Sequence, residues 1–196
     1  MKLYYHAGAC SLADHIALAE AGLPYALVSV DLKAKRTADG RDFTTINPKG
    51  YVPALELDDG QVLTENIAIL SYIAHQAGTL LPEHGLAHWR ALEATAFIST
   101  ELHKNFKPFF NPAASQAEKD EAAKILAKRF ALLDAQLGQQ PFLLGEAMTI
   151  ADAYLFVMLT WAGKNGIDLP AGLQAYHARL KERPSVARAL AEEEQA

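Results

Sequence analysis

Cys10 is the single cysteine of the sequence, and it stands where a short aromatic strand ends and a helical pattern begins. A thiol at a helix N-terminus lies against unpaired N–H groups and the positive end of the helix dipole, and both favour the thiolate. The alternative is a buried, inert side chain, because free cysteines are usually small core residues. The position between strand and helix favours the reactive interpretation. With no second cysteine, redox chemistry would need an external thiol.

Three further positions could take part in binding or catalysis. A cis bond between Val52 and Pro53 would leave the N–H and C=O of Val52 free for an extended ligand, whereas a trans bond would be an ordinary turn. Asn66 is a good helix N-cap, and Glu65 beside it could bind an ammonium group, although helix capping alone explains the pair. His103 lies on an apolar helical stripe, where a histidine is more often a core residue than a catalyst.

The sequence offers little support for a metal or nucleotide site. His84 and His88 have the i, i+4 spacing of helical metal ligands, but no third ligand and no HExxH motif accompany them. No GxGxxG or Walker motif is present. We therefore predict no metal site and no nucleotide cofactor.

The charge balance excludes several classes of protein. The 196 residues include 18 Lys and Arg and 23 Asp and Glu, a net charge of −5 that attracts neither nucleic acid nor an anionic membrane. Residues 1–9 lack the apolar core of a signal peptide, and the longest apolar run, Ala153–Leu159, is far too short to span a bilayer. A single cysteine excludes an internal disulfide, so we predict a cytoplasmic protein.

The first eighty residues alternate between strand and helix patterns. Apolar, β-branched and aromatic runs predict strands at residues 3–5, 26–30, 54–57 and 61–64. Helical spacing predicts one helix that ends at Gly22 and another that ends at Gly78. The polar stretch 33–41 is expected to be irregular or briefly helical. The order β-α-β-(α)-β-β-α predicts an α/β domain over residues 1–80.

Strand patterns disappear after a predicted linker at residues 81–86, and residues 87–196 are expected to form an all-helical domain. Spacings of three and four predict one long helix, ended by Pro108 and Pro112, whose inner face is Trp89, Leu92, Ala96, Ser99, His103 and Phe106. A second stripe on this helix is expected to pack against a twofold-related partner: Ala91, Thr95, Ile98 and Leu102. Thr149 and Asp152 predict a helix-capping pair.

Five segments, in the right order, resemble the cytosolic glutathione transferases, and most closely the bacterial beta class. They are Gly8-Ala9-Cys10-Ser11-Leu12, Asn47-Pro48-Lys49-Gly50 with Val52-Pro53-Ala54-Leu55, Leu63-Thr64-Glu65, Glu101-Leu102-His103-Lys104, and Thr149-Ile150-Ala151-Asp152-Ala153-Tyr154. The resemblance covers nearly the whole chain. It implies a thioredoxin-like N-terminal domain, an all-α C-terminal domain, a homodimer and a glutathione cleft between the domains.

The resemblance also implies the site residues of the first domain. Cys10 matches a position that touches the glutathione sulfur and can form a mixed disulfide with it. Val52 would pair with the cysteinyl main chain, Glu65 and Asn66 would hold the γ-glutamyl end, and Lys35 would reach the glycyl carboxylate. The predicted glutathione-binding residues here are Tyr5, Ala9, Cys10, Lys35, Val52, Pro53, Glu65 and Asn66. The family usually has serine where Asn66 stands, so weaker but intact binding is expected.

In the second domain, His103 matches a histidine near the thiol, with Thr100 and Lys104 beside it as further glutathione contacts. Cys10 and His103 are the predicted catalytic residues. The predicted acceptor pocket is aromatic, and its candidate residues are Phe106, Phe109, Phe110 and Trp161. Core packing is the alternative for each of these.

Three functions compete. The first is a glutathione S-transferase that conjugates reduced glutathione to hydrophobic electrophiles in detoxification, with disulfide exchange through Cys10. The second is a mainly redox enzyme that reduces disulfides or peroxides, and the third is a non-catalytic binding module of the same fold. Glutathione is the expected co-substrate, with no tightly bound cofactor. The hydroxyls of Tyr4, Tyr5 and Ser11 remain alternatives to Cys10 as the group that activates the thiol.

Overall fold

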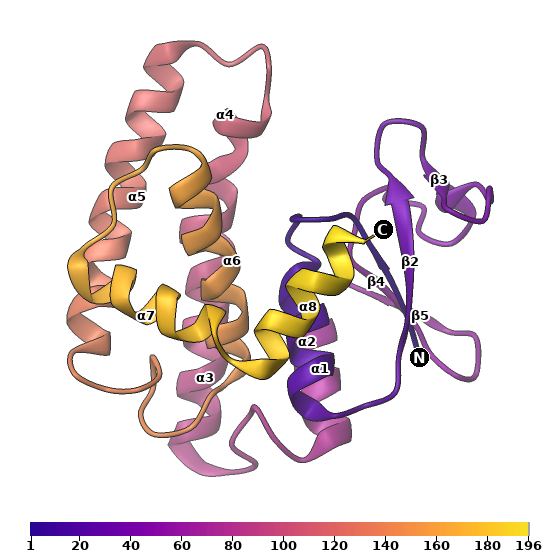
Figure 1. The fold of residues 1–196 in the computed structure, drawn as a ribbon, viewed down its shortest axis with the longest axis horizontal. Helices are drawn as coiled ribbons and strands as arrows, with labels where there is room; N and C mark the ends of the chain where they lie inside the picture. The colour runs from indigo at the N-terminus through magenta and orange to yellow at the C-terminus, as the bar shows by residue number, and fades with distance from the viewer. Residues whose placement is uncertain (196) are drawn as a thin grey trace. The chain divides into compact units, whose positions relative to one another are not determined.

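The computed structural model describes residues 1–195, and their contacts divide the chain into two compact units (Figure 1). Unit 1 contains Met1–Leu81 and the segment from Glu182 onward, and unit 2 contains Pro82–Lys181. The last helix, α8 (Pro184–Glu194), groups with unit 1 because it packs against α1 (Leu12–Ala21).

Unit 1 is built on a mixed five-stranded sheet in the order β3-β2-β1-β4-β5. Its strands are β1 (Lys2–Tyr5), β2 (Ala26–Asp31), β3 (Arg36–Thr37), β4 (Ala54–Glu56) and β5 (Val62–Thr64). β1 and β2 are parallel, and the other pairs are antiparallel. Helices α1, α2 (Asn66–Ala77) and α8 lie together beside this sheet (Figure 1). The predicted thioredoxin-like fold is confirmed, and the stretch expected to be irregular contributes the short strand β3.

Burial shows that the middle strand β1 and helix α1 form the centre of unit 1. Every residue of α1 from Leu12 to Leu18 is buried, including one carboxylate and one histidine. A second apolar cluster centres on Tyr4 and Phe43, with ring centroids 5.8 Å apart. Gly22 and Gly78 end α1 and α2 in the left-handed conformation that glycine adopts without a Cβ clash.

Unit 2 is all-helical, as expected. Its α-helices are α3 (Gly85–Phe97), α4 (Lys107–Phe110), α5 (Gln116–Leu137), α6 (Ile150–Lys164) and α7 (Ala171–Lys181). The expectation of one continuous helix up to Pro108 is wrong. The chain leaves α3 through a π-helical turn at Ile98–Leu102 and a 3₁₀ turn at His103–Phe106. Pro108 lies in the first turn of α4, where its missing N–H is no loss.

The predicted orientation of α3 is wrong: the stripe that faces the core is the one expected to face a partner subunit. Ala91, Thr95 and Ile98, expected to face a partner subunit, are fully buried, and α3 packs against α6. Trp89, expected on the inner face, is 64% exposed. Periodicity identified both stripes correctly, but it does not say which stripe faces the core when both are apolar.

The predicted cap of α6 is confirmed. The buried carboxylate of Asp152 accepts hydrogen bonds from the N–H and hydroxyl of Thr149, at 2.7 and 2.9 Å. It also accepts from the Leu143 N–H and the Tyr176 hydroxyl, so one side chain fixes a helix start, a loop and α7. Within residues 1–195, no helix has the length and apolar character needed to cross a membrane.

Candidate functional site

Cys10 lies in unit 1, on the loop between β1 and α1, and the residue as a whole is half-buried. The Sγ–H donates to the carbonyl oxygen of Val52 at 3.6 Å, and the Asn66 side-chain amide donates to the Cys10 carbonyl at 3.2 Å. The Val52–Pro53 peptide bond is cis. Three segments far apart in the sequence therefore meet at this thiol.

The electrostatic environment of Cys10 differs from the sequence expectation. Burial and the nearby carboxyl of Asp14 raise the pKa of the Cys10 thiol from its usual 9.0 to about 12. Hydrogen bonds from the Asn66 side chain and from the backbone N–H groups of Cys10 and Ser11 favour the thiolate but do not compensate. These surroundings oppose the predicted thiolate and favour a neutral Cys10 thiol at pH 7 in the free protein.

Asp14 is an uncommon feature of the same helix. It lies in the first turn of α1, is completely buried, and neither of its carboxyl oxygens has a hydrogen-bond partner among the described residues. Burial raises the pKa of this carboxyl well above 3.8. A buried acid without partners is most stable when protonated. Where Asp14 does ionise, at higher pH, its negative charge disfavours a thiolate on Cys10 and so raises the pKa of that thiol.

The loop that carries Cys10 is tied to α8. The Gly8 N–H donates to Glu193 at 2.8 Å, and the buried His15 ring contacts Glu192 at 2.8 Å and Glu193 at 3.3 Å. Burial raises the pKa of Glu192, but hydrogen bonds from Arg188, His15 and Tyr25 outweigh it, and the pKa falls to about 2. The C-terminal helix thus stabilises the turn that precedes the thiol.

Glu65 and Asn66 stand at the start of α2. Glu65, at a φ of 75°, is the N-cap residue, and Asn66 is the first helical residue, so the predicted Asn66 cap is wrong by one position. The Glu65 carboxylate accepts from Lys49 Nζ at 2.5 Å and from the Tyr51 hydroxyl at 2.8 Å, and these two bonds lower its pKa. The Oδ1 of Asn66 is buried without a hydrogen-bond partner in the described part of the chain.

Lys35 lies in the connection between β2 and β3, and its side chain reaches the loop at residues 50–52. Its Nζ donates to the carbonyl of Gly50 at 2.7 Å, two residues before Val52. Ala9, the neighbour of Cys10, packs on the Tyr4 cluster. The structure therefore brings together Cys10, Val52 and Asn66 directly, and it connects Lys35 to them through the loop at residues 50–52.

The alternative hydroxyl groups are engaged elsewhere in unit 1. Tyr4 donates to Glu56 at 2.5 Å. Tyr5 is 2% exposed, its ring lies 6.3 Å from His15, and burial raises its pKa. Ser11 is fully buried, and its hydroxyl donates to the carbonyl of His6 at 3.4 Å. Of these candidates, Cys10 has the most accessible side chain.

His103 lies in unit 2, in the 3₁₀ turn before α4. Its Nδ1 is 2.5 Å from the buried Tyr154 hydroxyl, and its ring packs edge-on against Trp161 with centroids 5.0 Å apart. Burial and the adjacent Lys104 lower the pKa of His103 to about 4, so the imidazole is neutral at pH 7. Thr100 is exposed, and its hydroxyl donates to the Ala96 carbonyl at 3.0 Å.

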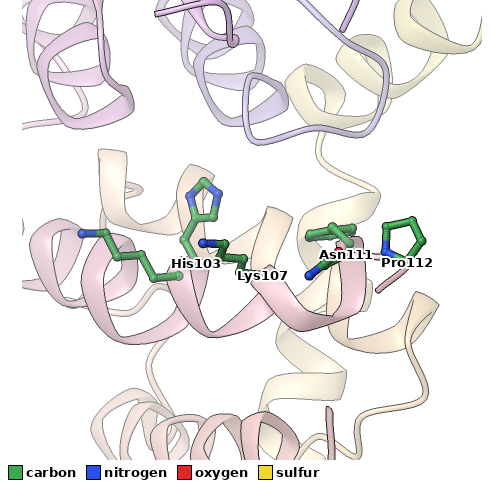
Figure 2. A pocket seen from close by; sticks show the side chains of 6 residues that line it. His103, Lys107, Asn111 and Pro112 are labelled. Atoms are coloured by element: carbon green, nitrogen blue, oxygen red, sulfur yellow. The ribbon is translucent and has the colours of Figure 1, made fainter. Parts of the chain in front are cut away.

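A pocket of about 670 Å³ opens on unit 2 beside this histidine (Figure 2). It is lined by His103, Lys104, Lys107, Phe110, Asn111 and Pro112. Of the four predicted aromatic residues, only Phe110 lines the pocket. Phe106 and Trp161 are buried, Trp161 packs against Phe110, and Phe109 contacts Phe106. The sequence analysis did not identify Lys107, Asn111 and Pro112 as pocket residues. The only sequence feature that could have indicated them is their position in a proline-containing segment shortly after His103.

Across residues 1–195, no three His, Cys, Asp or Glu side chains lie close enough to hold a metal ion. The polar groups near Cys10 are a thiol and an amide that donate hydrogen bonds and backbone carbonyls that accept them, a set suited to hydrogen bonding with a peptide.

Comparison with family models identifies both parts of the chain. Residues 1–75 match the model of the glutathione S-transferase N-terminal domain, and residues 97–184 match the model of the C-terminal domain. The glutathione S-transferase GstA of Escherichia coli O157:H7 is 43% identical over 199 residues, which cover 98% of each chain.

Solved structures agree with the sequence comparisons. A sphingomonad glutathione S-transferase in complex with glutathione is 45% identical, with a TM-score of 0.94 over the whole of both chains. A bacterial beta-class glutathione S-transferase from Sphingomonas chungbukensis is 43% identical, with a TM-score of 0.92 over 98% of both chains.

Proposed function

This chain belongs to the glutathione S-transferase family, and from that membership we propose that it conjugates reduced glutathione to hydrophobic electrophiles. It is a transferase that uses glutathione as its co-substrate and needs no tightly bound cofactor. The observation that carries the proposal is the meeting of the Cys10 thiol, the Val52 peptide and the start of α2 in unit 1.

Each part of this arrangement suits one part of glutathione. In the free protein the Val52 carbonyl accepts a weak hydrogen bond from the Cys10 S–H. When glutathione binds, this carbonyl would accept instead from the N–H of the cysteinyl residue of glutathione. Glu65, held ionised by Lys49 and Tyr51, would bind the γ-glutamyl ammonium group. The N–H groups at the start of α2 would bind the γ-glutamyl carboxylate, and Lys35 would bind the glycyl carboxylate.

The neutral Cys10 thiol supports a role as hydrogen-bond donor. In conjugation, the glutathione thiol loses its proton to solvent, and its sulfur attacks the electrophilic carbon and expels the leaving group. A neutral Cys10 S–H can donate to the developing glutathione thiolate, which stabilises that charge. Thr100, His103 and Lys104 of unit 2 remain predicted glutathione contacts.

This role is tested by replacing Cys10 with alanine. Wild-type protein and Cys10→Ala should both bind immobilised glutathione, elute with free glutathione, and turn over a chloro-nitrobenzene acceptor, with a reduced rate in the variant. The loss should be on the order of 10-fold, because one hydrogen bond to a charged group is removed. Binding without turnover of any electrophile or disulfide by the wild type would instead support the non-catalytic module.

A redox role is a second candidate, favoured by the half-buried position of the chain's single cysteine, which is not enclosed in the core. Attack of the Cys10 thiolate on oxidised glutathione would form one mixed disulfide and release one reduced glutathione. Intact mass spectrometry should then show one glutathionyl adduct per chain that a reductant removes and that is absent in Cys10→Ala. Because the thiol is neutral at pH 7, the adduct should form slowly there and faster at high pH.

We also propose a homodimer. Leu86 and Trp89 of α3 are 67% and 64% exposed, and Tyr51 of unit 1 is 44% exposed, which is high for large apolar side chains. Light scattering at micromolar concentration should report twice the chain mass, and a strict monomer would contradict this assembly. The cytoplasmic location stays a prediction.

A further inference from the structure

The pocket of unit 2 carries more positive charge than an apolar acceptor requires. Lys104 and Lys107 contribute two ammonium groups to its lining, and no carboxylate lines it. Neither lysine has an acidic partner among the described residues. Glu101, the acid nearest in sequence, contacts Arg129 of α5 at 2.7 Å. With a neutral His103 beside them, the two lysines make this pocket cationic on a chain whose net charge is −5.

The same pocket offers an aromatic surface next to this charge. Phe110 is 55% exposed, and its ring is supported edge-on by the buried Trp161, with centroids 4.7 Å apart. Lys107, Phe110 and Asn111 are spaced i, i+3 and i+4, which places them on one side of the α4 turn. Figure 2 shows His103, Lys107, Asn111 and Pro112 along one side of this segment.

An exposed ring, an ammonium group and an amide on one side of a short turn complement a flat ring that bears an anionic substituent. The ring would stack on Phe110, and the carboxylate would accept hydrogen bonds from Lys107 and from the Asn111 amide. An uncharged acceptor would gain the stacking contact alone.

We propose that this pocket selects aromatic electrophiles that carry a carboxylate, and that Lys107 is the residue that determines this specificity. The inference rests on the proposed transferase function. It adds a negative charge to the acceptor, which the sequence analysis predicted only to be hydrophobic. Lys104 adds to the positive potential, whereas Lys107 lies one turn from Phe110 and makes the direct contact.

The test compares two acceptors that differ in charge and little in shape, 4-chloro-3,5-dinitrobenzoate and 4-chloro-3,5-dinitrobenzamide. In both, the glutathione sulfur forms a bond to the ring carbon, chloride leaves, and the thiol proton goes to solvent. The wild type should favour the benzoate in kcat/KM, relative to the uncatalysed rates, by about 10-fold at low salt. In Lys107→Met this ratio should fall close to one, mainly through KM.

Two controls separate a local contact from a general field. Lys119→Met, in the first turn of α5, makes the same change in net charge and should leave the ratio unchanged, and Lys107→Arg should retain most of it. An equal loss in Lys119→Met, or no benzoate preference in the wild type, would overturn the proposal. Equilibrium titration with 3,5-dinitrobenzoate and its amide requires no turnover. Absence of any turnover would contradict the transferase function alone, whereas equal affinities for the two ligands would contradict the specificity proposal.

Discussion

Cys10 in unit 1 and His103 in unit 2 show how one physical effect acts on two different groups. Burial disfavours charge, so it raises the pKa of the acid Cys10 to about 12 and lowers the pKa of the base His103 to about 4. Both side chains are therefore neutral at pH 7. As neutral groups, the Cys10 thiol and the His103 imidazole can each donate or accept a hydrogen bond.

The surroundings of the two side chains differ. Around Cys10 the neighbours are polar: the Val52 carbonyl and the Asn66 amide form hydrogen bonds with Cys10, and the nearby Asp14 carboxyl is buried without a partner among the described residues. Around His103 the neighbours are aromatic, with one phenol partner and two lysines that lack acidic partners among residues 1–195. The first environment suits a peptide of fixed shape, and the second suits varied aromatic acceptors.

The largest expected effect is on glutathione binding by unit 1. Glu65→Ala removes the carboxylate that Lys49 and Tyr51 hold in place, and it should weaken binding by about 2–5 kcal/mol if the ammonium pair is desolvated in the complex. Isothermal titration with reduced glutathione measures this loss. Asp59→Ala, on the exposed turn between β4 and β5, is the matched control and should bind normally. Unchanged affinity in Glu65→Ala would remove the proposed γ-glutamyl site.

The next effect concerns stability near Cys10. Asp14→Ala removes a buried carboxyl without partners and should raise the free energy of unfolding by about 1–3 kcal/mol at pH 7. The gain should be smaller at pH 3. In the wild type the unfolded Asp14 ionises above pH 3.8 while the folded one stays protonated, so wild-type stability falls as pH rises through that range.

Asp14→Asn is the matched control, because it keeps a buried polar group of the same shape. It should gain less than Asp14→Ala. Denaturant titrations at the two pH values measure both variants, and a destabilised Asp14→Ala would show that the carboxyl has a stabilising role that its surroundings do not reveal.

The smallest effect is expected at His103. Tyr154→Phe removes the hydroxyl that lies 2.5 Å from Nδ1 and should destabilise the protein by about 1 kcal/mol, because a half-buried ring nitrogen loses its partner. Tyr72→Phe is the control, since the Tyr72 hydroxyl has no hydrogen-bond partner in the part of the chain that the structure describes. Thermal unfolding compares the two, and equal melting temperatures would show that the Tyr154 bond contributes nothing.

Sequence patterns predicted most elements of the fold but not the break after α3. Strand alternation, the Asp58-Asp59-Gly60 turn and the glycine stops all act locally, so they can be recognised without knowing the tertiary contacts. The π-helical turn at Ile98–Leu102 left no local signal, because apolar residues continue through it at helical spacing. The buried stripe of α3 depends on α6, and no periodicity within α3 reveals it.

In the candidate site, too, local features could be predicted from the sequence and features that depend on tertiary packing could not. Residue type and position already singled out Cys10, Val52 and Asn66, the resemblance joined them in one site, and the structure brings them together. The charge state of Cys10 could not be predicted, because it depends on burial and on Asp14, whose carboxyl is buried by tertiary packing. Lys107 was missed because one lysine in a loop-like segment has no signal until the pocket is seen.

The pH dependence of Cys10 alkylation in the glutathione-free protein tests the central claim most directly. Since Cys10 is the only thiol of the sequence, the rate of reaction with iodoacetamide reports its thiolate fraction alone. If burial keeps the thiol neutral, the rate should be far below that of a free cysteine at pH 7 and should still rise, with no plateau, above the ordinary thiol pKa of 9.0. A plateau reached below pH 9.0 would contradict the account, because it would mean that the start of α1 stabilises the thiolate more than burial and Asp14 oppose it.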